Sequence, residues 1–245
     1  MPPPSRINLG LRPLCRDNPW PEFDYGEIEP FEFSLDSGGH AGRELIVDVI
    51  RARNIDLMLE VGCFLCGSAL QWLRTSDTLT VIGADPWEGN WGTYFESLSR
   101  DPVRARAMNR WTEEQIATMV HNLRRFGNFS IALNNVRQYK TRFIPVRRRA
   151  PEVFYYLRDR RIEPKLIYID ADKKREDLDV ARELFPNAVL CGDDWLWADN
   201  SGVLRMQEHV KAFAGEHNYT IKASRQTWLL IAPEFEPAKS DDAVV

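Results

Sequence analysis

With 245 residues, 44% of them hydrophobic, the chain is long enough to bury the core of one substantial α/β domain rather than two. Its 32 lysines and arginines against 36 aspartates and glutamates give a net charge of −4, which argues against a nucleic-acid-binding protein. No apolar run approaches the roughly twenty residues of a membrane span, no signal-peptide pattern follows Met1, and the four cysteines do not suggest a disulfide framework. We therefore expect a cytoplasmic protein with no membrane partner.

The first part of the chain has no regular pattern. Residues 1–40 are rich in proline, glycine and aromatic residues, and we expect an irregular arm that packs on the domain, because aromatic side chains favour burial. The domain itself is expected over residues 41–235, followed by a C-terminal tail over residues 236–245. Apolar residues at helical spacing predict an amphipathic helix over residues 43–53.

A strand–turn–helix–strand unit comes next. A short apolar strand is predicted over residues 57–61, a helix over residues 68–73 and a second strand over residues 79–84. This order is typical of a parallel sheet with a right-handed crossover.

An insert interrupts the alternation after the second strand. Residues 87–135 hold several aromatic residues and a polar helix, roughly residues 112–126, which begins at a capping box formed by Thr112 and Gln115. An insert of this size could form a lid over a site, and the alternative is plain scaffold.

Strands and helices alternate again after the insert. The pattern predicts strands over residues 141–146, 165–169 and 188–191, helices over 150–158, 176–184 and 202–214, and two final strands over 219–223 and 227–231. The final pair is typical of a hairpin that places an antiparallel strand at the sheet edge. The predicted fold class is therefore α/β: a Rossmann-like, mostly parallel sheet with helices on both faces, an antiparallel C-terminal strand and a helical insert after the second strand.

Three aspartates follow the ends of two predicted strands. Asp170 comes directly after residues 165–169, and Asp193 and Asp194 follow residues 188–191. In an open α/β sheet the ligand crevice lies beyond the carboxyl ends of the strands. Acids gathered there would repel one another unless a cation lay between them, and Mg²⁺ prefers oxygen ligands. We interpret the three acids as ligands of Mg²⁺ or a similar divalent ion, with helix capping as the alternative.

The turn after the first strand has the composition of an anion-binding loop. Gly62 allows close approach of the backbone to a ligand, and Gly67 and Ser68 begin a helix whose free N–H groups favour a carboxylate. The second glycine lies five residues after the first, so the turn is not the GxGxxG fingerprint, and a nicotinamide oxidoreductase is disfavoured. Asp85 follows the second strand, where an acid commonly accepts hydrogen bonds from ribose hydroxyls.

The pattern Glu-x-Gly-x-aromatic-x-x-x-Ser at residues 60–68, the acid after the second strand and the later aspartates resemble the metal-dependent class I S-adenosylmethionine methyltransferases. The similar branches are the macrocin/novobiocin-type sugar O-methyltransferases and, more distantly, catechol O-methyltransferase. The resemblance covers roughly residues 38–231 but is sharp only at the motifs. It implies a set of cofactor-binding residues: Glu60, Gly62, Cys63, Phe64 and Ser68 at the methionine end, Asp85 at the ribose and Trp87 at the adenine.

The resemblance also implies roles for the later acids. Asp170, Asp193 and Asp194 would bind the metal ion. The general base of the sugar branch is an aspartate two positions beyond the first ligand, where this chain has Asp172, and that of the catechol branch is a lysine one position further, where it has Lys173. We favour Asp172, because an aspartate is ionised at neutral pH whereas a lysine must first lose a proton.

The implied activity is a Mg²⁺-assisted transfer of a methyl group from S-adenosylmethionine to a hydroxyl of a sugar, nucleotide sugar or glycosylated small metabolite. The aromatic residues suit a sugar face and a planar phenol equally, and a basic run at residues 147–149 favours a nucleotide-linked sugar. The chain departs from the family pattern at Cys66, where a glycine is usual, and at residues 173–175, where His and Tyr are common. The alternatives are a catechol-type phenol O-methyltransferase, a hydroxylase-type relative and a non-catalytic cofactor-binding module. A small molecule is the expected partner, and a homo-oligomer is left open.

Overall fold

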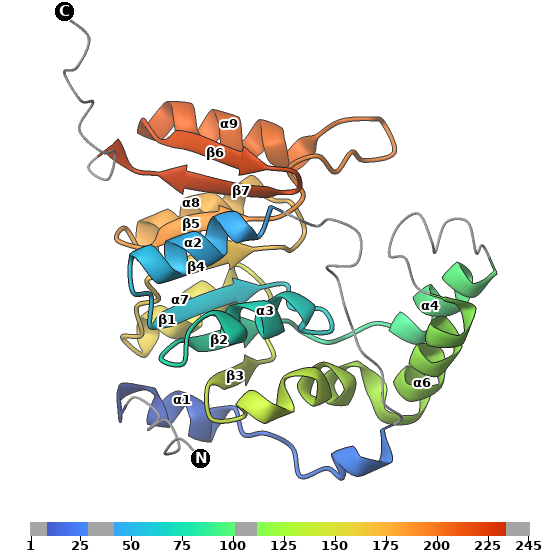
Figure 1. Cartoon of the computed structure of the whole chain (residues 1–245). Coiled ribbons are helices and arrows are strands. Elements are labelled where there is room, and N and C mark those ends of the chain that lie inside the picture. The colour runs from blue at the N-terminus through green and yellow to red at the C-terminus, as the bar shows by residue number, and fades with distance from the viewer. Residues whose placement is uncertain (1–8, 29–41, 101–111, 234–245) are drawn as a thin grey trace, which may run out of the picture.

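The computed structural model describes residues 9–28, 42–100 and 112–233, and its centre is a seven-stranded sheet of order β3-β2-β1-β4-β5-β7-β6 (Figure 1). The strands are β1 (Leu57–Val61), β2 (Thr80–Ala84), β3 (Phe143–Val146), β4 (Leu166–Ile169), β5 (Val189–Gly192), β6 (Thr220–Ser224) and β7 (Thr227–Ile231). Strands β1 to β5 run parallel, whereas β6 and β7 form an antiparallel hairpin beside β5. The predicted fold class and the antiparallel C-terminal pair are confirmed.

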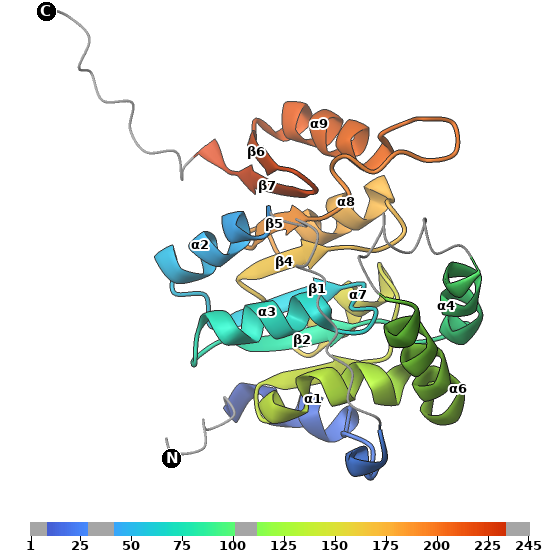
Figure 2. The ribbon, with the colours of Figure 1, turned by 45° about the vertical axis from the view of Figure 1, so that its right-hand side comes forward.

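Helices cover both faces of the sheet (Figures 1 and 2). One face packs against α2 (Glu44–Ala52), α3 (Gly67–Thr75) and the C-terminal part of α6 (Glu113–Val136), and the other against α1 (Arg12–Asp17), α7 (Glu152–Asp159), α8 (Arg175–Leu184) and α9 (Arg205–His217). The parallel strands are buried on both sides, which explains why they are continuous apolar runs in the sequence.

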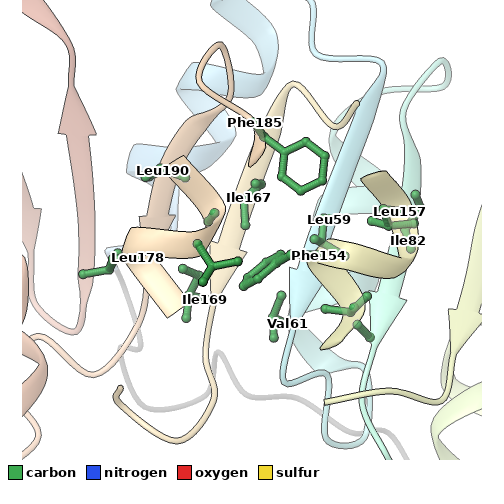
Figure 3. Packing of buried hydrophobic residues seen from close by; sticks show 14 of the residues in the cluster. Leu59, Val61, Ile82, Phe154, Leu157, Ile167, Ile169, Leu178, Phe185 and Leu190 are labelled. Carbon is green, nitrogen blue, oxygen red and sulfur yellow. The ribbon is translucent and has the colours of Figure 1, made fainter. Parts of the chain in front are cut away.

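Alternate side chains of each strand pack into the core on opposite faces of the sheet. In β1, Met58 belongs to the cluster beneath α2 and α3, whereas Leu59 and Val61 belong to the cluster beneath α7 and α8. In Figure 3 the ring of Phe154, from α7, lies near Val61 and Ile169 of the neighbouring strands β1 and β4. This packing fixes the ends of the two central strands.

The insert after β2 builds a smaller core of its own. Its helices α4 (Trp91–Ser99) and α6 pack together around Phe95 and Met119. The predicted capping box is confirmed: Thr112 Oγ1 accepts from the Gln115 amide at 3.2 Å, and Gln115 Oε1 accepts from the Thr112 amide at 2.8 Å. The helix bends at Gly127, whose φ is +78°. Residues 101–111 of the predicted insert lie outside the described residues.

The N-terminal arm is more regular than the sequence suggested. Within its described part, α1 forms with Pro13 in its first turn, a position where the missing N–H of proline costs nothing. Leu14 is fully buried against the α7 side of the core, and Trp20 packs on the opposite side. The predicted tail and the rest of the arm lie outside the described residues. No helix among the described residues is long and apolar enough to span a membrane.

Candidate functional site

Four loops meet at one edge of the sheet because the strands before them end in register. The last residue of β1 pairs with the last residues of both β2 and β4, and the last residue of β4 pairs with that of β5. The residues that follow the four strands are Gly62, Asp85, Asp170 and Asp193. Strands β1 and β4 are neighbours although β2 and β3 come between them in the chain, so this edge holds the switch point where α/β proteins bind ligands.

A cavity of about 560 Å³ opens at this edge. All the predicted site residues except Glu60 and Trp87 line it: Gly62, Cys63, Phe64, Ser68, Asp85, Asp170, Asp172, Lys173, Asp193 and Asp194. The loops carry unusual backbone conformations, since Phe64, Trp87, Lys173 and Asp194 all have φ between 47° and 66°. Non-glycine residues in the left-handed region are uncommon and cluster at binding sites.

The two predicted residues that do not line the cavity, Glu60 and Trp87, hydrogen-bond with residues that do line it. Glu60 is fully buried and accepts a hydrogen bond from the Ser68 hydroxyl at the start of α3. Burial raises the pKa of Glu60 to about 7, against the opposing effect of that hydrogen bond. Trp87 is also buried, packs at 5.0 Å on the ring of Phe129 and donates its indole N–H to the Phe64 carbonyl at 2.8 Å. Both side chains hold the loop that follows β1.

Asp85 ties two of the loops together. Its Oδ2 accepts from the Phe64 amide at 2.9 Å and its Oδ1 from the Trp87 amide at 2.6 Å. Burial raises the pKa of Asp85, and these backbone hydrogen bonds oppose the shift. Each carboxylate oxygen has a second lone pair, so Asp85 can still accept from a ligand in the cavity.

Gly62 is required by the fold as well as by a ligand. Its φ is +88°, and a Cβ at this position would lie 1.9 Å from the Asp170 carbonyl oxygen. We expect Gly62→Ala to lower the free energy of unfolding well beyond the about 1–2 kcal/mol of a left-handed alanine, because backbone atoms cannot yield as a side chain can. Gly89→Ala is the matched control, since Gly89 has a φ of +87° with nothing within 4 Å.

Thermal unfolding of the two glycine variants measures the difference. For a protein of this size about 1 kcal/mol shifts the melting temperature by about 2–4 °C. Equal losses in Gly62→Ala and Gly89→Ala would show that backbone strain alone matters and that the close approach of β1 to the β4 loop does not.

The three strand-end aspartates are accompanied by two cations. Arg43, just before α2, is 3% exposed, and its Nη2 lies 2.8 Å from Asp193 Oδ2 and 3.9 Å from Asp170 Oδ2. Lys173 Nζ lies 2.7 Å from Asp194 Oδ2. Burial and the neighbouring Asp193 and Asp194 raise the pKa of Asp170 well above its usual range, whereas Arg43 and Lys173 act in the opposite direction.

This arrangement differs from the predicted metal site. Asp170, Asp193 and Asp194 do lie at one edge, but no group of three acidic, histidine or cysteine side chains in the described part of the chain is arranged to hold a metal ion. Asp193 is engaged through both oxygens, since Oδ2 accepts from Arg43 at 2.8 Å and Oδ1 from the Asp194 amide at 3.0 Å, and the guanidinium would repel a second cation at this carboxylate. The residues as they lie do not fit a divalent ion. The sequence pattern indicated that a cation must accompany these acids, but nothing in the pattern marked Arg43 as that cation.

The two candidate bases have different surroundings. Asp172 has a side chain that is 64% exposed, and its Oδ2 lies 3.1 Å from Lys174 Nζ. Lys173 is less exposed, is held by Asp194 and lies 4.7 Å from the centroid of the Trp197 ring. Both line the cavity, and only Lys173 contacts the aspartates that follow β5.

The cavity also holds buried charged residues that were not predicted from the sequence. Besides Arg43 they include Asp177, which is 1% exposed in the first turn of α8 and whose pKa burial raises to about 6. Gln226 is a further unpredicted residue of the wall, whereas the aromatic residues and arginines that line it were expected from the sequence as groups suited to the acceptor: Trp91, Tyr94, Trp197, Arg148 and Arg149. Trp195, another aromatic residue expected from the sequence to suit the acceptor, packs against the core. The acid in the first turn of a predicted helix was the one local signal for Asp177.

No family model and no curated protein matches the chain. Solved structures to which it is similar include an O-methyltransferase from Bacillus cereus in complex with SAH (13% identity, TM-score 0.48, 91% of each chain covered). Another is TomG from Streptomyces achromogenes, an O-methyltransferase involved in tomaymycin synthesis, in complex with SAM (16% identity, TM-score 0.46, 84% of this chain and 92% of that chain covered). A third is the SAH-bound methyltransferase PaMTH1 from Podospora anserina (12% identity, TM-score 0.42, 76% of this chain and 75% of that chain covered). Identities and TM-scores are low throughout, so we infer function from the residues of the site.

Proposed function

We propose that the chain is an S-adenosylmethionine-dependent O-methyltransferase that acts on a hydroxyl of a small molecule. The observation that carries this proposal is that the Gly62 turn and Asp85 open into the same cavity as Asp170 and Asp172. A glycine turn before a helix suits the carboxylate of the cofactor, and an acid after the next strand suits its ribose. The cavity volume lies within the range of small-molecule sites.

The chain would contribute binding, orientation and a proton acceptor. The bound cofactor supplies a methyl group activated by its positively charged sulfur. The walls hold the acceptor oxygen in line with the carbon–sulfur bond, so that the C–O bond forms as the C–S bond breaks. Asp172 takes the hydroxyl proton, because its carboxylate lines the cavity and is paired only through one oxygen with the exposed Lys174. The Lys173 ammonium is held in an ion pair with Asp194 and, while it is protonated, has no lone pair with which to accept a proton.

A sugar or nucleotide sugar is the acceptor class that we propose. Trp91, Tyr94 and Trp197 present rings to the cavity, and such flat apolar faces pack well on a sugar ring. Arg148 and Arg149 line the same cavity, where they pair with the exposed carboxylates of Glu152 and Glu88, and exchange of these weak exposed pairs for a phosphate would suit their guanidinium groups. A planar phenol would use the rings equally well but would make no use of the two arginines for binding.

Isothermal titration with S-adenosylhomocysteine and with NAD⁺ tests the proposed cofactor. We expect one S-adenosylhomocysteine to bind per chain and no binding of NAD⁺, because the turn lacks the spacing of a dinucleotide site. Binding of NAD⁺ alone would contradict the proposal. Binding of S-adenosylhomocysteine without methyl transfer to any of a panel of nucleotide sugars, glycosides and catechols would favour a non-catalytic cofactor-binding module.

A further inference from the structure

Arg43 is the buried cation of the candidate site, and no motif marked it. It precedes α2, lies 150 residues from Asp193 in the sequence and reaches the cavity between the loops that follow β4 and β5. Its side chain is only 4% exposed. A buried guanidinium needs nearby negative charge, and the strand-end aspartates provide it.

The contacts of the guanidinium group are incomplete. Nη2 donates to Asp193 Oδ2 at 2.8 Å, and Nε donates to the Tyr168 hydroxyl at 3.3 Å. Nη1 is buried and has no hydrogen-bond partner in the described ranges. Buried donors are nearly always satisfied in native proteins, and Arg43 is one of the residues that line the cavity, so its unpaired N–H points to a ligand oxygen as its partner.

A divalent ion would compete directly with the two cations already present. Asp193 is engaged through both oxygens, by Arg43 and by the Asp194 amide, and Asp194 is engaged by Lys173. An ion bound to all three aspartates would lie close to the Arg43 guanidinium, and repulsion between the two cations would drive Arg43 from Asp193. A displaced guanidinium in this buried position would lose its ion pair without gaining water, which is costly.

We propose that Arg43 provides, in place of a divalent metal ion, the positive charge between Asp170 and Asp193, and that its Nη1 is a binding group for an oxygen atom of the acceptor. This inference rests on the proposed function, which it deepens by making methyl transfer independent of metal. The acceptor oxygen would be positioned by a fixed guanidinium rather than by an exchangeable ion.

Titration of the protein with Mn²⁺, followed by the electron paramagnetic resonance signal of the free ion, tests the assignment without an acceptor. We expect the unaltered chain to bind no stoichiometric Mn²⁺ up to about 1 mM, the weak end of the range for protein sites of divalent ions. Arg43→Gln should gain one Mn²⁺ site with a dissociation constant at least about tenfold below that 1 mM limit, because the substitution leaves the aspartates without their buried cation. Arg142→Gln removes another buried arginine with the same change of net charge, far from these acids, and should gain none.

Two results would overturn the assignment. One is a single Mn²⁺ site in the unaltered chain that Asp170→Asn abolishes, since Arg43 would then yield its place to the ion. The other is a folded Arg43→Gln variant that gains no site. If Arg43→Gln fails to fold, the titration of the unaltered chain still shows whether a Mn²⁺ ion binds to the aspartates while Arg43 is present. Binding of S-adenosylhomocysteine, measured on the same samples, separates this test from that of the proposed function: its absence would contradict the cofactor, not the role of Arg43.

Discussion

Replacement of Asp172 by asparagine is expected to lower the turnover of methyl transfer by about 10²–10⁴-fold, the usual contribution of a positioned general base. Asparagine keeps the size of the side chain but cannot accept the proton of the acceptor hydroxyl. Binding of S-adenosylhomocysteine should remain nearly unchanged, because Asp172 follows β4 whereas the proposed cofactor residues follow β1 and β2. The measurement is methyl transfer from labelled S-adenosylmethionine to the acceptor panel.

Lys174→Gln is the matched control for this prediction. Lys174 is the ion-pair partner of Asp172, with Nζ 3.1 Å from Oδ2, and its loss would reproduce any effect that came from the pair itself. We expect this variant to keep most of its turnover, since an exposed pair is worth little. Lys173→Gln should reduce turnover less than Asp172→Asn. A larger loss in Lys173→Gln would identify the lysine as the base, as the catechol branch implies.

The same assay with a chelator distinguishes the two possible sources of positive charge at the aspartates, the Arg43 side chain and a divalent metal ion. Arg43 is part of the chain, so turnover should survive removal of divalent ions. Loss of turnover on chelation, restored by Mg²⁺, would instead support the metal-assisted reaction that the sequence resemblance implies.

Replacement of Asp85 by alanine is expected to weaken S-adenosylhomocysteine binding by about 10- to 150-fold. This range corresponds to about 1.5–3 kcal/mol for a hydrogen bond to a charged group, here the bond between the carboxylate and a ribose hydroxyl. The measurement is isothermal titration. Unchanged affinity would contradict the assignment of the cofactor to this part of the cavity.

The loop contacts of Asp85 require a second variant. Because its oxygens also accept from the Phe64 and Trp87 amides, alanine removes support for the loops as well as a ligand contact. Asp85→Asn keeps one acceptor oxygen and the shape of the side chain, so it should lose less affinity than alanine. Thermal unfolding of the ligand-free variants measures the loop contribution separately, because the ribose contact is absent there.

Local sequence determined most of the secondary structure. Apolar runs of strand length that end at Gly62, Asp85, Asp170 and Asp193 predicted four parallel strands whose ends meet, and the register confirmed this geometry. These features follow from contacts between residues close in the chain and from burial on both faces of the sheet. Periodicity and capping likewise predicted the first half of α6, whereas its bend at Gly127, its continuation to Val136, the helix α4 and the helix α1 in the arm were not expected.

Tertiary structure alone decided how the charges of the site are balanced. The sequence placed three aspartates together and indicated that a cation must accompany them, but it could not distinguish an ion from a side chain. That choice depends on α2 packing beside the central strands, which brings Arg43 to Asp193 across 150 residues. It also depends on burial, which strengthens the attraction between Arg43 and Asp193 and makes either charge costly to leave unpaired. Sheet order and burial are properties of the whole fold, and no local pattern around Arg43 encodes them.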